Sequence, residues 1–257
     1  MNKILKPTFL PWFALASGGI GLALRFWLLS TGVDGKGLLV SGHPADILLW
    51  VLTAAVIAVI ITVCLPLSQA NKYSFNFPSS PIGAIGEAAL ALGILVSSVD
   101  TLGSTSDPLS TATMGIGFLS VPVLCFCAIC RWNGKHPQFF FHGLVCVYWI
   151  LRLVAQYRSW SPEPQLQNYA FQLFATVFML LAIYQRTAFD ANLGNRRKHA
   201  IYHLGAVFFC CLSLVGSKDW LLYGTCVLWA FGDMCKLIPM PNWKPQFLKK
   251  GEDHDPA

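Results

Sequence analysis

The chain has 257 residues, of which 55% are hydrophobic and only 12% are charged. Soluble domains carry roughly 25% charged residues, so this composition excludes an ordinary water-soluble domain and indicates an integral membrane protein. The formal net charge is +6, but the cations lie in short segments beside apolar stretches. We therefore expect them to meet the lipid bilayer, with its anionic headgroups at the cytoplasmic face, and we exclude nucleic acid as a partner.

Eight apolar stretches, each close to the ~17–25 residues that a helix needs to cross hydrocarbon, predict eight transmembrane helices. They cover residues 8–30, 44–67, 81–99, 109–130, 138–157, 166–185, 200–216 and 219–238. No gap between them holds the ~50 residues of a soluble domain. We therefore predict an all-α, polytopic integral membrane helix bundle. It forms a single transmembrane domain over 1–257, with a short cytoplasmic tail at 242–257.

Proline residues support four of the predicted helix starts. Proline is tolerated at the first helical position, because its missing N–H would have no partner within the helix there. The pattern occurs at His43–Pro44, Ser80–Pro81, Asp107–Pro108 and His136–Pro137. Ser80 and Asp107 are also favourable N-caps.

The distribution of Lys and Arg predicts which end of the bundle faces the cytoplasm, because basic segments stay on that side. Of the 18 Lys and Arg residues, 13 lie in alternate gaps that include both termini, namely Lys3, Lys6, Lys72, Arg131, Lys135, Arg186, Arg196, Arg197, Lys198, Lys236, Lys244, Lys249 and Lys250. Only Lys36, Arg158 and Lys218 lie in the other gaps. We therefore expect both termini in the cytoplasm and the protein in a plasma membrane of bacterial type.

The last two predicted spans allow a second arrangement. Residues 200–216 are few for a crossing, and the connection Gly216–Ser–Lys–Asp219 is tight. The pair could therefore form a re-entrant hairpin instead of two crossings. Both arrangements return the C-terminus to the cytoplasm, so the charge distribution does not separate them.

Small residues share one face of the first and third predicted helices. In lipid, small side chains let helix backbones approach closely, and packing replaces the hydrophobic force that acts in water. The residues concerned are Ala14, Gly18 and Gly21 on the first helix and Gly83, Gly86, Ala89 and Gly93 on the third. We expect close helix–helix contacts at these positions.

Polar and basic residues in the outer halves of four predicted helices form a candidate ligand pocket. They are Arg25, Asp100, Arg152, Gln156, Asn168 and Gln172. Arg25 and Arg152 lie at similar depths inside their spans, and a guanidinium offers paired donors that suit a carboxylate or another anion. The alternative is structural: the two arginines snorkel to headgroups or Arg25 pairs with Asp100, and the amides join helices.

A second group of chemistry-bearing residues lies toward the cytoplasmic side. It consists of Glu87, His142, His199, His203 and Asp233. His199 and His203 are four residues apart, so both rings can face the same way on a helix. Imidazoles and a carboxylate bind zinc when three or four of them converge, and bound zinc can activate water. Without convergence, His199 extends the basic segment and His203 makes an ordinary hydrogen bond.

The segment His199–Ala–Ile–Tyr–His203 is similar to the HxxxH motif of membrane hydrolases of the adiponectin-receptor and hemolysin III type. The resemblance covers five residues and implies zinc-dependent hydrolysis. The second motif of that superfamily, Ser-xxx-His on an early helix, is missing, because Gln138 lies four residues before His142. We therefore infer no membership of that superfamily.

Three functions remain open from the sequence. The first is transport or sensing of a small solute such as an anion through the outward-facing pocket, which requires no cofactor. The second is a structural or accessory membrane subunit without a ligand of its own. The third is a metal-dependent membrane hydrolase, and zinc is expected only in this case. The sequence does not predict an oligomeric state or the identity of a substrate.

Overall fold

The computed structural model describes residues 9–32, 42–67, 72–102, 107–160, 169–235 and 237. Most of these residues are helical, and none of them forms a strand. The helices are α1 (Leu10–Thr31), α2 (Pro44–Cys64), α3 (Tyr73–Asn76), α4 (Pro81–Leu102), α5 (Pro108–Trp132), α6 (Phe139–Trp160), α7 (Ala170–Asp190), α8 (Arg196–Ser213) and α9 (Trp220–Cys235). Eight of them are long and correspond to the eight predicted spans. The predicted tail at 242–257 lies outside the described residues.

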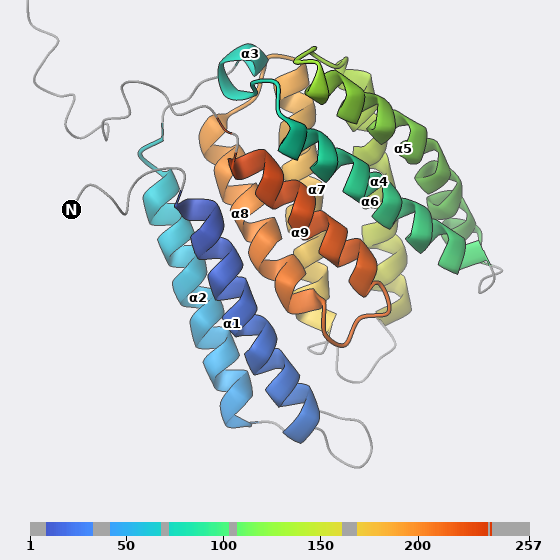
Figure 1. The fold of residues 1–257 in the computed structure, drawn as a ribbon. Helices are drawn as coiled ribbons and strands as arrows, with labels where there is room; N and C mark the ends of the chain where they lie inside the picture. Colours follow the sequence, from blue (N-terminus) through green and yellow to red (C-terminus); the bar gives the residue numbers. More distant parts are fainter. Residues whose placement is uncertain are drawn as a thin grey trace, which may run out of the picture.

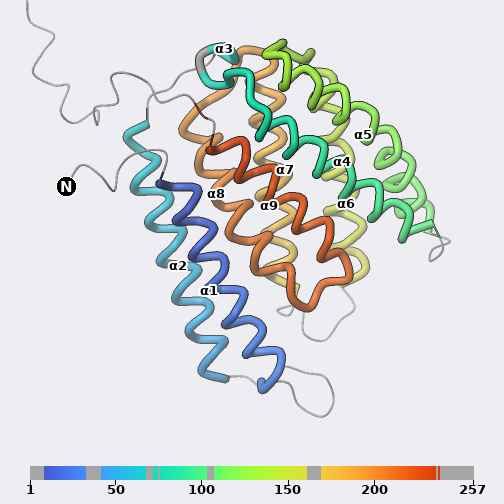
Figure 2. Tube along the Cα trace, viewed as in Figure 1, coloured from blue at the N-terminus to red at the C-terminus, as the bar shows by residue number. Residues whose placement is uncertain are grey.

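The long helices alternate in direction along the chain (Figure 1). We call the end at which α1, α4, α6 and α8 begin the upper end, and the opposite end the lower end. The tube in Figure 2 shows the hairpin of α1 and α2 at one side of the bundle and α4 with α5 at the other. The short helix α3 lies at the upper end.

Six helices are long and apolar enough to cross a membrane: α1, α2, α4, α5, α6 and α7. Their outward faces carry large apolar side chains that no other helix covers, as Val51 and Val59 on α2 illustrate. This exposure is unfavourable in water and suits hydrocarbon. The protein is therefore a membrane-embedded helix bundle.

The helices α8 and α9 do not meet the same length and composition criteria. The first turn of α8 carries three cations, and α9 has only 16 residues. Helix α8 is enclosed by α1, α2, α7 and α9, and its residues 203–213 are all buried. A helix that is enclosed by protein on all sides needs no lipid-facing apolar surface of its own. Both helices run between the upper and lower ends of the bundle (Figure 1).

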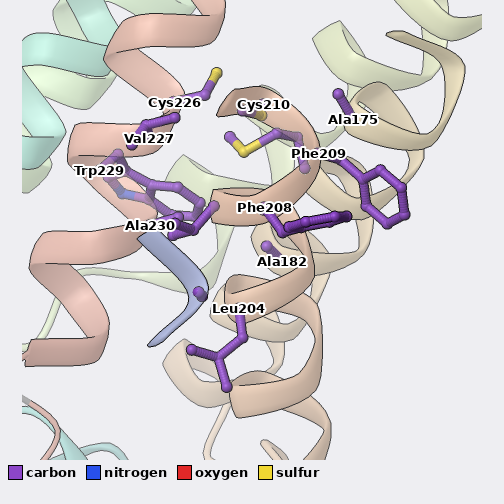
Figure 3. Close-up of a cluster of buried hydrophobic side chains, with 14 of the residues drawn as sticks. Ala175, Ala182, Leu204, Phe208, Phe209, Cys210, Cys226, Val227, Trp229 and Ala230 are labelled. Carbon is purple, nitrogen blue, oxygen red and sulfur yellow. The ribbon is translucent and has the colours of Figure 1, made fainter. Parts of the chain in front are cut away.

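The core around α8 is built from aromatic and small side chains. Figure 3 shows Phe208 and Phe209 of α8 in one cluster with Ala175 and Ala182 of α7 and Trp229 of α9. Phe208 is fully buried, and Phe209 is 1% exposed. Phe209 stacks on Phe178 of α7 with ring centroids 5.0 Å apart. This packing fills the centre of the bundle between its two ends.

Helix starts agree with the proline pattern at three positions. Helices begin at Pro44, Pro81 and Pro108, whereas α6 begins at Phe139, two residues after Pro137. Ser80 is an N-cap, because its Oγ accepts a hydrogen bond from Gly83 N at 3.1 Å. Asp107 occupies the N-cap position of α5 without a capping hydrogen bond from its side chain.

Glycines allow neighbouring helices to approach closely, as predicted. A Cβ atom on Gly18 would lie 2.8 Å from Cys211 Cβ of α8, and one on Gly86 would lie 3.0 Å from Trp229 Cα of α9. Real Cβ atoms essentially never come within 3.0 Å of another heavy atom. By contrast, a Cβ on Gly19, the next residue of α1, meets nothing within 4 Å.

The adjacent glycines Gly18 and Gly19 provide a matched test of the packing of α1 on α8. We expect Gly18→Ala to lower the free energy of unfolding in detergent micelles by ~1–3 kcal/mol, because the added methyl group forces the helices apart. Gly19→Ala should be neutral or raise it by up to ~1 kcal/mol, since alanine is the better helix former. Equal effects of the two substitutions would contradict this packing.

Candidate functional site

Two polar clusters lie at opposite ends of the bundle. The lower cluster comprises Ser97, Tyr148, Arg152, Gln156, Gln172, Thr176, Asp219 and Tyr223. The upper cluster comprises Glu87, Arg131, His142, Arg186, Asp190, His199, His203 and Asp233. In both, residues distant in sequence meet because alternate helices place them at the same depth.

The lower cluster is built on the ion pair between Arg152 of α6 and Asp219 of the turn before α9. The Arg152 Nη2 atom lies 2.7 Å from Asp219 Oδ2. Arg152 Nη1 also donates to Ser97 Oγ at 2.8 Å, and Ser97 Oγ donates to Asp219 Oδ1 at 3.2 Å. The arginine side chain is 8% exposed and the aspartate 31%. The pair is thus partly desolvated, and the carboxylate is its open side.

Amide and hydroxyl groups extend the lower cluster from α6 to α7 and α9. Thr176 Oγ1 donates to Gln156 Oε1 at 2.9 Å, and Gln156 Nε2 donates to Tyr223 OH at 3.4 Å. Gln172 Nε2 donates to Gly216 O at 3.1 Å. These bonds join three helices and the turn between α8 and α9 into one polar surface.

Two cavities adjoin this polar surface. The larger has a volume of about 380 Å³ and is lined by Gln156, Ser159, Trp160, Tyr169, Gln172, Gly216, Ser217, Lys218 and Asp219. The smaller has a volume of about 180 Å³ and is lined by Thr101, Ser110, Thr113, Arg152, Ala155, Gln156, Ser159 and Asp219. In the larger cavity, Trp160 and Tyr169 stack with ring centroids 4.9 Å apart. The cavities share three lining residues and form a polar recess at the lower end.

The structure brings together part of the pocket predicted from the sequence. Arg152, Gln156 and Gln172 lie in the lower cluster. Arg25 is buried with its guanidinium 5.3 Å from the centroid of the Phe171 ring, and it lines neither cavity.

The two remaining predicted pocket residues, Asp100 and Asn168, are not among the described residues of the lower cluster. Asp100 is exposed and lines neither cavity, and Asn168 lies outside the described residues. The sequence reasoning missed Asp219 and Tyr223 as members of the lower cluster. The polar turn Gly216–Ser–Lys–Asp219 was the available signal for the first.

The upper cluster has two centres, and the first is the carboxylate of Asp233. Arg131 Nη2 lies 3.1 Å from Asp233 Oδ1, and Arg186 Nη1 lies 3.4 Å from both carboxylate oxygens. His199 Nε2 and His203 Nε2 lie 3.4 and 3.5 Å from Asp233 Oδ2. All five side chains are almost completely buried. Four helices, α5, α7, α8 and α9, therefore converge on one carboxylate.

The ring of His142 is the second centre of the upper cluster. Its Nδ1 atom lies 2.5 Å from Asp190 Oδ2, and its Nε2 atom lies 3.3 Å from Glu87 Oε1. Cys127 Sγ lies 4.0 Å from the same Nδ1 atom. An imidazole between two buried carboxylates can hold a proton for either one.

Aromatic side chains cover the upper cluster. The ring centroid of Phe77 lies 4.1 Å from Arg186 Cζ and 4.8 Å from Arg131 Cζ. Tyr73 OH accepts a hydrogen bond from Arg186 Nη2 at 3.3 Å, and Tyr73 N donates to Asn192 Oδ1 at 3.1 Å. The segment of α3 thus closes the upper end over the charged groups.

All five residues of the predicted inner group, Glu87, His142, His199, His203 and Asp233, lie in the upper cluster. They form two centres rather than one, and the ligand atoms of His199, His203 and Asp233 lie within 4.8 Å of one another. The sequence reasoning missed Asp190, which ends α7 beside His142.

Three cations that we counted at the cytoplasmic surface are instead buried. Arg131, Arg186 and Arg196 are each at most 1% exposed. The reason is that α5 and α7 extend beyond the predicted spans, to Trp132 and Asp190, while α8 already begins at Arg196. Arg131 and Arg186 thereby reach the carboxylate of Asp233 inside the bundle.

A layer of apolar side chains separates the two clusters. On α7, Met179, Ala182 and Ile183 lie between Thr176 and Arg186 in sequence, and all three are fully buried. The corresponding buried residues on the other helices are Val145 and Trp149 of α6 and Cys226, Trp229 and Ala230 of α9. The polar recess at the lower end therefore does not continue to the upper cluster.

Comparison with protein-family models, curated proteins and solved structures gave no match. The chemistry of the two clusters therefore has to be inferred from their own geometry.

Arg152 and Arg158 lie on the same helix and provide a matched test of the lower cluster. We expect Arg152→Ala to lower the free energy of unfolding by ~3–5 kcal/mol, because it leaves the partly buried Asp219 without its cation. Arg158 is 63% exposed and lies 3.9 Å from Asp107, so Arg158→Ala should change it by less than ~1 kcal/mol. Unfolding in mixed micelles measures both values, and similar losses would contradict the buried pairing.

Proposed function

We propose that this membrane protein binds a small carboxylate-bearing solute in the recess of the lower cluster and transports it across the membrane. The observation that carries the proposal is the cavity of about 380 Å³, which is lined by amides, hydroxyls and both signs of charge inside an otherwise apolar bundle. Polar and ionisable groups in membrane helices are costly and generally serve a function.

Charge favours a carboxylate as the ligand group. Among the described residues that line the two cavities, Lys218 and Arg152 lie against the carboxylate of Asp219, and the balance of these three groups is +1. Lys218 is exposed and is available to a ligand anion. An ammonium or hydroxyl group on the same solute would find acceptors in Asp219 and Gln156. Amino acids and hydroxy acids have this combination of groups.

The arrangement along the bundle favours transport over sensing alone. A transporter with alternating access has a solute site that is open to one side and closed toward the other. Here the recess is followed by the apolar layer, with the buried charges of the upper cluster beyond it. Motion of α6 or α7 against α8 and α9 would open the layer and move the solute toward the upper end.

We also propose that the lower end faces the outside of a plasma membrane and that both termini are cytoplasmic. Without the three buried arginines, ten cations remain in the alternate sequence gaps that include both termini, against three in the other gaps. This imbalance still favours the upper end as the cytoplasmic one.

Cysteine labelling in intact cells tests the site and the orientation together. Ser217→Cys lines the recess, whereas Arg158→Cys lies at the same end and lines neither cavity. We expect a membrane-impermeant maleimide to label both variants. Glutamate or succinate should protect Ser217→Cys only, and mannitol should protect neither. Adding Lys218→Glu should weaken the protection roughly tenfold, because one charge-assisted contact is lost.

Two results would contradict the proposal. Labelling that requires permeabilised cells would reverse the orientation. Labelling of Ser217→Cys that neither carboxylate slows would remove the recess as a carboxylate site.

A further inference from the structure

The side chains of His199, His203 and Asp233 carry an inference that is independent of the lower recess. We propose that they bind a divalent transition-metal ion of the zinc type within the upper cluster. His199 and His203 lie one turn apart on α8, and Asp233 approaches from α9. The two rings are adjacent, with centroids 3.7 Å apart and planes tilted by 37°.

Two of the distances in this group match those between metal ligands. Zinc bonds of about 2.0–2.1 Å in a tetrahedral arrangement place neighbouring ligand atoms about 3.4 Å apart. The two imidazole Nε2 atoms lie 3.4 and 3.5 Å from Asp233 Oδ2. Three protein ligands leave a fourth position for water, as in zinc sites that perform catalysis.

The hydrogen bonding of His203 points to a cation in this position. Its Nδ1 atom lies 3.0 Å from the backbone oxygen of His199. A carbonyl oxygen only accepts, so Nδ1 carries the hydrogen, and a neutral ring then directs the lone pair of Nε2 toward Asp233 Oδ2. Two lone pairs that face each other repel unless a cation lies between them. Metal-bound histidines typically donate their other N–H to a carbonyl or carboxylate in this way.

No other described group satisfies these nitrogen atoms. Both ring nitrogens of His199 and the Nε2 atom of His203 are buried and lack a hydrogen-bond partner among the described residues. Buried polar atoms of this kind are rare in native proteins and call for a bound ion, a water molecule or a proton. Asp233 Oδ2 faces the Nε2 atoms of both His199 and His203. This arrangement favours one ion that is bound by all three atoms.

The net charge of the upper cluster is compatible with a bound divalent cation. The upper cluster holds the carboxylates of Glu87, Asp190 and Asp233 against the guanidinium groups of Arg131 and Arg186. With neutral imidazoles, the balance of these five groups is −1, and a proton held by His142 between Glu87 and Asp190 brings it to zero. Arg131 binds Asp233 on its Oδ1 side, at 3.1 Å. Arg186 Nη1 lies 3.4 Å from both oxygens, so Oδ2 is shared by Arg186 and the two histidines.

Metal analysis of the protein, purified in detergent through a tag without histidine, tests the proposal. We expect about one zinc ion per chain after loading with zinc chloride and dialysis. His203→Gln should reduce the bound metal at least roughly tenfold, and His199→Gln should do the same. His136→Gln, which removes an exposed histidine at the same end, should leave it unchanged. Equal zinc in the wild type and in His203→Gln, or no zinc in the wild type, would overturn the proposal.

Cobalt loading of the wild-type protein keeps the test decisive if the variants do not fold. A tetrahedral site with two imidazoles and a carboxylate gives cobalt a visible absorption without the intense thiolate charge-transfer band in the near ultraviolet. The chain has nine free cysteines, and binding to them would produce that band. A thiolate band, or no visible absorption, would overturn the assignment to His199, His203 and Asp233.

Discussion

Charge neutralisation inside the bundle is the constraint on which the rest of this structure depends. A charge in the interior of a membrane protein loses water and gains no polar solvent from lipid, so an opposite charge on a neighbouring helix stabilises it. Asp233 is paired with Arg131 and Arg186, and Arg152 is paired with Asp219. These pairs join helices distant in the chain and fix how α5, α6, α7 and α9 are rotated relative to each other.

The same constraint explains why the polar groups lie at the two ends and the apolar groups between them. Near an end, a carboxylate or a guanidinium can be reached by side chains from several helices and by the connecting segments. In the middle, contact between backbones depends on small residues such as Gly18 and Gly86 and on aromatic rings such as Phe208. The result is a closed apolar layer with a polar recess on one side and a buried charged cluster on the other. That division supports both the transport proposal and the metal proposal, which use different ends of the molecule.

Much of the fold was predictable from the sequence, because the thickness of the bilayer sets the length of a helix that crosses it. The eight predicted spans coincide with the eight long helices, and Pro44, Pro81 and Pro108 begin helices as expected. The placement of His142, His199 and Asp233 at one end of the bundle followed from their depth in the predicted spans. Rotation of each helix about its axis was not predictable, because lipid and protein interior are equally apolar. For that reason, the enclosure of α8 and the burial of Arg186 became evident only from the structure. Asp219 was missed because its role depends on where a turn places it beside α6.

A double-mutant cycle between Arg186 and Asp233 measures the central claim most directly. The free energy of unfolding is determined in mixed micelles for Arg186→Met, Asp233→Asn and the double variant. If the buried pairing holds the bundle together, Asp233→Asn lowers the stability by ~3–5 kcal/mol in the wild type. Its cost should fall by at least ~1 kcal/mol once Arg186 is absent. Effects of the two substitutions that add to within ~0.5 kcal/mol would show that these groups do not interact, and would contradict the account.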